Sequence, residues 1–211
     1  KYLLPLGDSY LLAILVKRMF AAGVKHVYIG ANSENYEFVQ RYAPEGCTVY
    51  LANTETMSET VLAARYYCGD EDVIMGMPDS YWTDEKVFQR LAPQLDIMDS
   101  VAALGLWMTS YPNQHRKLGM VDTQGGIGVR QVIDKPQETD LYWAWGVMAW
   151  HPSFWIYVLP ADAHVGFAAQ RAIEDKQVVV SSQNMDDYYD CGTFDEYALL
   201  IRTLTTEAVN S

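Results

Sequence analysis

Two aspartates follow short apolar runs at points where a sheet protein could bind a ligand. Asp79 comes just after the apolar run 72–77, and Asp190 ends a short strand-like run before the Gly192-Thr193 turn. Open α/β sheets bind ligands beyond the carboxyl ends of their strands. Two facing carboxylates repel each other unless a hard cation neutralises them, and Mg²⁺ takes one or two carboxylates together with phosphate oxygens. For Asp79 the same spacing is also typical of a turn or helix cap, and spacing does not show whether the two side chains meet.

A lysine provides a candidate positive charge. Asp134-Lys135-Pro136 ends the strand-like run 128–134, and Lys135 is either a point charge for a phosphate or a solvated turn residue. The segment 125–128 is rich in glycine but lies between two strand-like runs with no helix after it, which predicts a hairpin turn rather than a phosphate loop. Five aromatic residues are expected to lie mostly in the hydrophobic core or in the wall of a pocket, and one or two of them could stack on a sugar ring. They are Tyr142, Trp143, Trp145, Trp150 and Trp155.

Alternating helices and strands must position these residues. Apolar periodicity predicts helices at 9–22, 33–43 and 58–67 and strands at 24–30, 47–52 and 72–77. Asp8 or Ser9 is expected to cap the first of these helices, Gly23 to end it, and Ser33 to cap the second. Strand-rich sequence follows from 99 to 150, then helices at 152–159 and 162–174, a strand at 178–182 and a helix after 193. We predict a single α/β domain over 1–211, with a mixed, mainly parallel sheet covered by helices on both faces.

Composition excludes several classes of protein. Half of the residues are hydrophobic and 20% are charged, which excludes intrinsic disorder. The 27 acidic and 15 basic residues give a net charge of −12, which disfavours nucleic-acid binding. No apolar run reaches the length of a membrane span. Cys47, Cys68 and Cys191 have no CxxC spacing, which predicts reduced cysteines in a cytoplasmic protein. The four histidines are scattered, which disfavours a histidine-built metal site.

Five segments, in order, carry a resemblance over essentially the whole chain. The sequence resembles the sugar-phosphate nucleotidyltransferases (nucleotide-sugar pyrophosphorylases), among them glucose-1-phosphate thymidylyltransferase. The matching segments are KYLLPLGD (1–8), MGMPDSYW (75–82), KLGMVDTQGGIGVRQVIDKP (117–136), WAWGVMAWHPSFW (143–155) and YYDCGTFDEY (188–197). The resemblance implies a Rossmann-like, GT-A-like fold, with a nucleotide half over about 1–98 and a sugar-phosphate half over about 99–211.

The resemblance also implies a reaction and roles for individual residues. A sugar-1-phosphate oxygen would attack the α-phosphorus of a nucleoside triphosphate and release pyrophosphate, with Mg²⁺ as cofactor and a homo-oligomer compatible with the family. Asp79 and Asp190 would hold Mg²⁺, and Lys135 and Lys1 would contact phosphates. The residues implied to bind substrate are Ser58 and Glu59 near the base, Asp134 at a sugar hydroxyl, and Gly119 and Gly146 in the sugar pocket.

Departures from the family keep two alternatives open. The family's glycine-rich GGxGTRL loop, which precedes the segment matched by 1–8, has no counterpart in the printed sequence, so we expect the chain as printed to be a poor catalyst. Ser9-Tyr10 replaces the family's Lys-Pro, and the stretch 53–60, expected to contact the base, lacks a glycine. The alternatives are a non-catalytic nucleotide-sugar-binding relative, acting as a sensor or partner subunit, and a GT-A glycosyltransferase.

Overall fold

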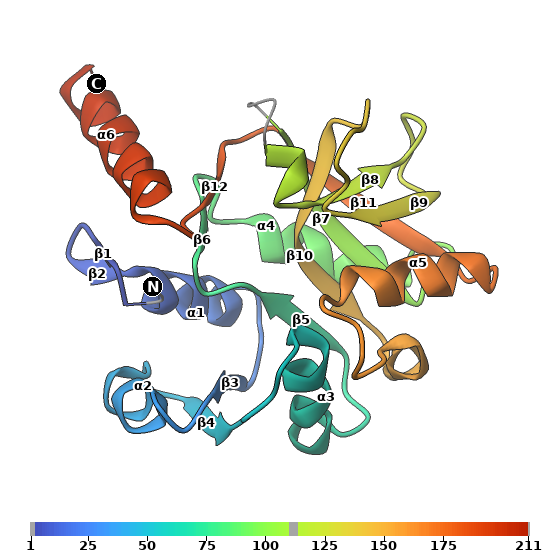
Figure 1. Cartoon of the computed structure of the whole chain (residues 1–211), viewed down its shortest axis with the longest axis horizontal. Helices are drawn as coiled ribbons and strands as arrows, with labels where there is room; N and C mark the ends of the chain where they lie inside the picture. Colours follow the sequence, from blue (N-terminus) through green and yellow to red (C-terminus); the bar gives the residue numbers. More distant parts are fainter. Residues whose placement is uncertain (1–2, 110–113, 211) are drawn as a thin grey trace.

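A six-stranded mixed sheet forms the centre of the molecule (Figure 1). The structure is a computed structural model and describes residues 3–109 and 114–210. The sheet runs in the order β11 (Val179–Asn184), β7 (Ala102–Met108), β10 (Trp143–Trp150), β8 (Gly119–Asp122), β9 (Gln131–Asp134), and β5 (Val73–Gly76) also pairs with β10. On one edge β10 pairs with β8 through 143–145 and with β5 through 147–150.

The predicted α/β class and mixed sheet are confirmed. Parallel pairing is limited, among the strands that the structure describes, to β7 with β11 and β3 (Val27–Ala31) with β4 (Cys47–Leu51). The strand alternation predicted more parallel pairs than this. The difference arises because β10 lies at the centre and runs antiparallel to β5, β7 and β8.

Helices cover both faces of the sheet, as predicted, and every residue of β10 is buried. Successive strand residues point to opposite faces. Met148 and Trp150 join the cluster that contains α5 (Gly166–Glu174) and residues of α3 (Met57–Cys68). Val147 and Ala149 join the opposite cluster, with α1 (Leu11–Ala21) and α4 (Val87–Leu91). The apolar run of β10 therefore follows from burial on both sides.

The helix starts differ from those expected. Neither Asp8 nor Ser9 caps α1: Tyr10 is the N-cap and its side chain makes no capping bond. The reason is a local hairpin, in which β2 (Ser9–Tyr10) pairs with β1 (Pro5–Leu6) and delays the helix. Gly23, with φ of 89°, follows the end of α1 as expected. α2 (Tyr36–Tyr42) starts after Asn35 instead of Ser33, and the expected helix at 152–159 is the 3₁₀ helix η3 (Pro152–Tyr157).

Several short elements complete the fold. β6 (Ser80–Trp82) and α4 were not predicted, nor were the 3₁₀ helices η1 (Ala92–Asp96) and η2 (Gln114–Arg116). β12 (Tyr188–Asp190) precedes α6 (Phe194–Asn210). The glycine-rich segment 125–128 lies in the connection between the antiparallel strands β8 and β9, so the predicted hairpin is confirmed.

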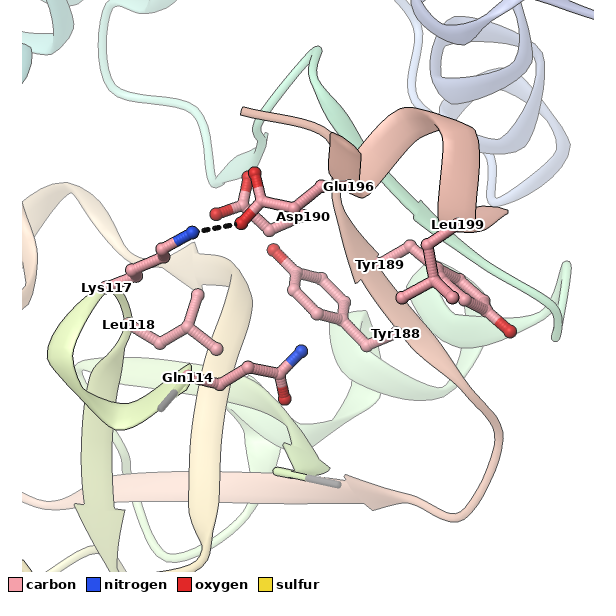
Figure 2. Close-up of a pocket in the computed structure, with 8 residues that line it drawn as sticks. All are labelled: Gln114, Lys117, Leu118, Tyr188, Tyr189, Asp190, Glu196 and Leu199. Carbon is pink, nitrogen blue, oxygen red and sulfur yellow. Dashed lines mark hydrogen bonds and ion pairs between the residues drawn. The ribbon is translucent and has the colours of Figure 1, made fainter. Parts of the chain in front are cut away.

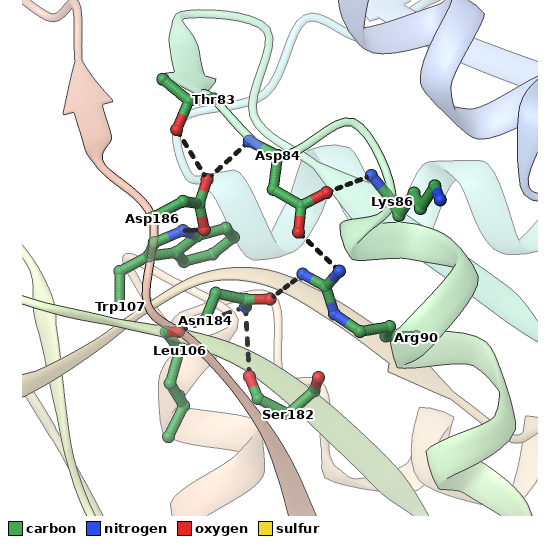
Figure 3. A network of polar contacts seen from close by, with 9 residues as sticks. All are labelled: Thr83, Asp84, Lys86, Arg90, Leu106, Trp107, Ser182, Asn184 and Asp186. Carbon is green, nitrogen blue, oxygen red and sulfur yellow. Dashed lines mark hydrogen bonds and ion pairs between the residues drawn. The ribbon is translucent and has the colours of Figure 1, made fainter.

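A polar network fixes the segment that leads into β12 (Figure 3). Asp186 Oδ2 accepts hydrogen bonds from the Asp84 amide at 2.8 Å and from Thr83 Oγ1 at 3.3 Å, and Asp186 Oδ1 accepts one from Trp107 Nε1 at 3.0 Å. Arg90 donates to Asp84 Oδ2 at 2.6 Å and to Asn184 Oδ1 at 2.7 Å. These bonds join α4, β7 and β11 just before β12 begins.

Within 3–109 and 114–210, no helix is both long enough and apolar enough to span a bilayer. Cys47, Cys68 and Cys191 are all free thiols, in agreement with the expectation of reduced cysteines.

Candidate functional site

β6 and β12 bring Asp79 and Asp190 together. Asp79 lies within a turn in which the Ser80 amide donates to Met77 O at 3.2 Å, so the chain reverses directly after β5. β6 pairs antiparallel with β12, with Ser80 opposite Asp190. The Cys191 amide donates to Asp79 O at 2.7 Å and ties the two aspartates to the same end of the pair.

The two carboxylates form a site of negative charge that is only partly compensated. Burial is the main cause that raises the pKa of Asp190 above its usual value, and the charges of Asp79 and Glu196 add to it. The Gly192 amide, which donates to Asp190 Oδ1 at 3.0 Å, and the Lys117 charge act in the opposite direction. No ion pair among the described residues includes either aspartate.

This donor set fits Mg²⁺. In the described part of the chain, no cluster of three or more histidine, cysteine or acidic side chains could hold a metal ion. Mg²⁺ needs no such cluster, because it is commonly bound by one or two carboxylates, with waters and phosphate oxygens completing its shell. Asp79 and Asp190 could supply those two carboxylates.

A small pocket of about 40 Å³ lies beside Asp190. Figure 2 shows Lys117 and Glu196 forming an ion pair at its mouth, next to the Asp190 carboxylate. The hydrogen bond that Lys117 donates to Glu196 raises the pKa of Lys117. Tyr188 also lines the pocket, and its hydroxyl lies 2.8 Å from Ser80 Oγ. Neither Lys117 nor Glu196 was identified as a site residue from the sequence.

Asp134, Lys135 and Gly119 lie together at the end of the β8–β9 pair. Gly119 is opposite Asp134, and the Lys135 amide donates to Leu118 O at 3.1 Å. Residues 117–119 therefore run from the pocket beside Asp190 to the segment that holds Lys135. Lys135 has a φ of 46°, in the left-handed region, just where the strand ends.

His164 links Lys135 to Asp134. Lys135 Nζ lies 2.8 Å from His164 Nε2, and His164 Nδ1 lies 3.0 Å from Asp134 Oδ2. A lysine ammonium only donates, so His164 Nε2 is the acceptor, whereas His164 Nδ1 is buried close to Asp134 without a hydrogen-bond partner among the described residues. The Asp134 side chain is 7% exposed. Sequence reasoning did not identify His164, because a single histidine 29 residues from Lys135 carries no spacing signal.

Aromatic rings cover the two glycines expected in the sugar pocket. A methyl group added at Gly119 would overlap the Trp145 indole, and one added at Gly146 would lie 2.5 Å from Tyr188 Cε2. Both positions therefore require glycine for the close approach of a ring. Trp145 Nε1 is buried and has no hydrogen-bond partner among the described residues. The sequence left open which aromatic residue would contact a sugar, and Trp145 is the one that packs on Gly119.

Ser58 and Glu59 lie in the first turn of α3. Ser58 is fully buried, while Glu59 Oε2 accepts from the Glu55 amide at 2.8 Å. Thr56 caps the helix by accepting from the Glu59 amide at 3.0 Å. The Met57 amide donates to Ala163 O at 3.2 Å, which holds this end of α3 beside the loop that carries His164. The contact of Ser58 and Glu59 with a base stays a prediction, and Lys1 lies outside the described residues.

The fold is shared with solved structures of nucleotide-sugar pyrophosphorylases. Apo UDP-glucose pyrophosphorylase has a TM-score of 0.78 at 14% identity, over 99% of this chain and 91% of that one. UDP-glucose pyrophosphorylase complexed with UDP-glucose has a TM-score of 0.79 at 14% identity, over 98% and 90%. A UTP-bound UGPase from Acinetobacter baumannii has a TM-score of 0.76 at 14% identity, over 98% and 86%. No family model and no curated protein matches the sequence. The chain therefore has a sugar-phosphate nucleotidyltransferase-like fold.

Proposed function

We propose that this chain transfers a nucleotidyl group from a nucleoside triphosphate to a sugar-1-phosphate, with Mg²⁺ as cofactor. The observation that carries the proposal is the meeting of Asp79 and Asp190 across β6 and β12, where neither forms an ion pair with another described residue. Structures with the same fold have been solved with UDP-glucose and with UTP bound, which supports a nucleotide and a sugar phosphate as the substrates.

The proposed reaction requires no covalent bond between the protein and a substrate. An oxygen of the sugar-1-phosphate forms a bond to the α-phosphorus, and the bond from that phosphorus to the bridging oxygen breaks. Pyrophosphate leaves with the electron pair. Such a transfer depends on in-line positioning and on neutralisation of charge. Mg²⁺ held by Asp79 and Asp190 would neutralise part of the phosphate charge.

Lys135 is the proposed ligand of the sugar phosphate. Its contact with His164 uses one of the three ammonium protons and leaves two for phosphate oxygens. His164 and Asp134 would then hold the ammonium in one place before the substrate arrives, which lowers the entropy lost on binding.

Pyrophosphate release by the full-length protein tests the proposal. We expect Mg²⁺-dependent release when a nucleoside triphosphate and a sugar-1-phosphate are both present. Asp79→Asn and Asp190→Asn should each lower kcat at least about 100-fold, the scale of losing one electrostatic contact to the transition state. Asp70→Asn, at an exposed turn residue, is the matched control and should keep normal activity. Near-normal turnover in both site variants would refute the proposal.

A second candidate is a nucleotide-sugar-binding protein without turnover. It is favoured by the polar groups at the start of α3, which bind other parts of the chain, and by the rings that cover Gly119 and Gly146. It predicts saturable binding of a nucleotide-sugar by calorimetry with no pyrophosphate formed under any condition. Transfer of sugar to an acceptor instead would identify the glycosyltransferase alternative.

A further inference from the structure

A groove of about 720 Å³ is lined by residues of α1, of α6 and of the segment from β6 to α4. Its volume is in the range of small-molecule sites. α1 lines it with residues at helical spacing, so that one face of the helix forms a wall: Ile14, Lys17, Arg18 and Ala21. α6 forms the opposite wall with Ile201, Leu204 and Thr205.

Arg18 is a buried cation that lines this groove. It is 6% exposed, and Nη1 donates to Trp82 O at 2.8 Å. The guanidinium carbon lies 5.0 Å from the centre of the Tyr81 ring. Nε is buried without a hydrogen-bond partner, and no ion pair in the described part of the chain includes Arg18. A buried charge without a counter-charge is costly, so the site is suited to receive an anion.

The surroundings of Arg18 add to the positive charge. Lys17 and Lys86 are exposed and line the groove, while Glu85 is its one acidic lining residue among those described. This local excess of positive charge stands out on a chain with a net charge of −12. Most of the remaining lining is apolar, with Leu6, Ile14, Tyr81, Ile201 and Leu204. The groove is therefore complementary to a molecule with an acidic group at one end and an apolar body.

We propose that this groove binds a small amphipathic anion. Its carboxylate, sulfonate or phosphate group faces Arg18, with Lys17 and Lys86 beside it, and its apolar body packs between α1 and α6. The proposal rests on Arg18 and the groove alone, so it stands or falls independently of the proposed nucleotidyl transfer.

Two fluorescent probes that differ by one charge test the site. The first, 8-anilinonaphthalene-1-sulfonate, has an aromatic body and a sulfonate, and N-phenyl-1-naphthylamine is the same ring system without the sulfonate. We expect one equivalent of the sulfonate to bind saturably, at least about tenfold more tightly than the neutral probe, because a charge-assisted contact is lost in the latter. Higher salt should weaken the sulfonate selectively. Equal affinities for the two probes would overturn the proposal.

Variants locate the binding. Lys17→Met with Lys86→Met should weaken the sulfonate about fivefold, since each exposed lysine contributes modestly. Ala21→Trp places a large ring in the groove and should abolish binding. The matched control, Lys25→Met with Lys176→Met, changes two exposed lysines outside the groove and should bind as the wild type does.

Arg18→Met is the most direct variant, but Arg18 also holds the Trp82 carbonyl, so circular dichroism must first establish that it folds. The lysine pair and Ala21→Trp keep the test decisive if it does not. Wild-type affinity for the sulfonate in both of those variants would overturn the proposal.

Discussion

Neutralising Asp190 should make the metal-free protein more stable. Burial and the neighbouring Asp79 raise the pKa of Asp190 in the folded state, so its ionised form opposes folding at neutral pH. Asparagine removes the charge and keeps an oxygen that can accept from the Gly192 amide. In EDTA at pH 7, Asp190→Asn should therefore unfold at a higher temperature than the wild type.

Burial makes the larger contribution to the effect, and the repulsion between the two charges makes a second contribution that can be measured by itself. As a general scale, unit charges about 4 Å apart at an effective dielectric constant of about 20 interact by about 4 kcal/mol. Partial exposure and the opposing charge of Lys117 reduce it, so a double-mutant cycle with Asp79→Asn should give a coupling of about 0.5–3 kcal/mol. For a chain of this size, each kcal/mol corresponds to a change of about 2–4 °C in Tm.

The stability difference between Asp190→Asn and the wild type should depend on pH in one direction. A raised pKa means that the folded state binds the proton more tightly than the unfolded state. The penalty is therefore fully present above the folded pKa and disappears as the pH falls through it toward the ordinary aspartate value. The stability difference between Asp190→Asn and the wild type should shrink over that acidic range in EDTA. With Mg²⁺ present, the wild type should gain stability and the variant should not.

Asp84→Asn is the matched control, with the opposite sign. Burial opposes ionisation there too, but the Lys86 amide and Arg90 lower the pKa of Asp84 below its usual value. Neutralising Asp84 should therefore destabilise the protein at neutral pH. The reasoning is refuted if Asp190→Asn also destabilises the protein in EDTA, because the two aspartates would then be equally well compensated.

Three other substitutions test the surrounding geometry. His164→Gln keeps an acceptor for Lys135, so KM for the sugar-1-phosphate should stay near normal. His164→Ala removes that acceptor and should raise KM with little change in kcat, and equal effects of the two substitutions would argue against a positioning role. Gly146→Ala drives a methyl group into an aromatic ring and should cost about 1–3 kcal/mol in urea unfolding, and an unchanged midpoint would contradict the observed contact. Asp186→Ala leaves the Trp107 indole N–H without its acceptor and should cost about 1–3 kcal/mol, measured by thermal unfolding, with Asp187→Ala as the control.

The elements that the sequence predicted well are those with a strong local signal. The apolar run that forms β10, the turn at Gly125 and the helix end at Gly23 depend on burial or on φ values that glycine favours. β6 and α4 were missed because three and five residues are too few to show a period. The late start of α1 reflects the pairing of β1 with β2, which helical periodicity does not encode.

The candidate site was predictable only in part. Asp79 and Asp190 were identified from their positions after short strands, but their meeting depends on the pairing of β6 with β12, which brings together residues far apart in the sequence. Lys117 and His164 were missed for a similar reason, since each acquires its partner only when distant segments pack. The sequence motifs therefore identified which residues could act and in which order they occur along the chain. The charges that surround Asp190 depend on contacts between distant segments, which the motifs do not encode.

The proposed nucleotidyl transfer is tested most directly by following the phosphate group of the sugar-1-phosphate into the products. The full-length protein is incubated with Mg²⁺, a nucleoside triphosphate and a sugar-1-phosphate labelled with ¹⁸O in its phosphate, and the products are analysed by mass spectrometry. The account predicts a nucleotide-sugar that carries the label and pyrophosphate that does not, with both products formed at least about 100-fold more slowly by Asp190→Asn. Binding of both substrates without any labelled nucleotide-sugar, or undiminished product from the variant, would contradict it.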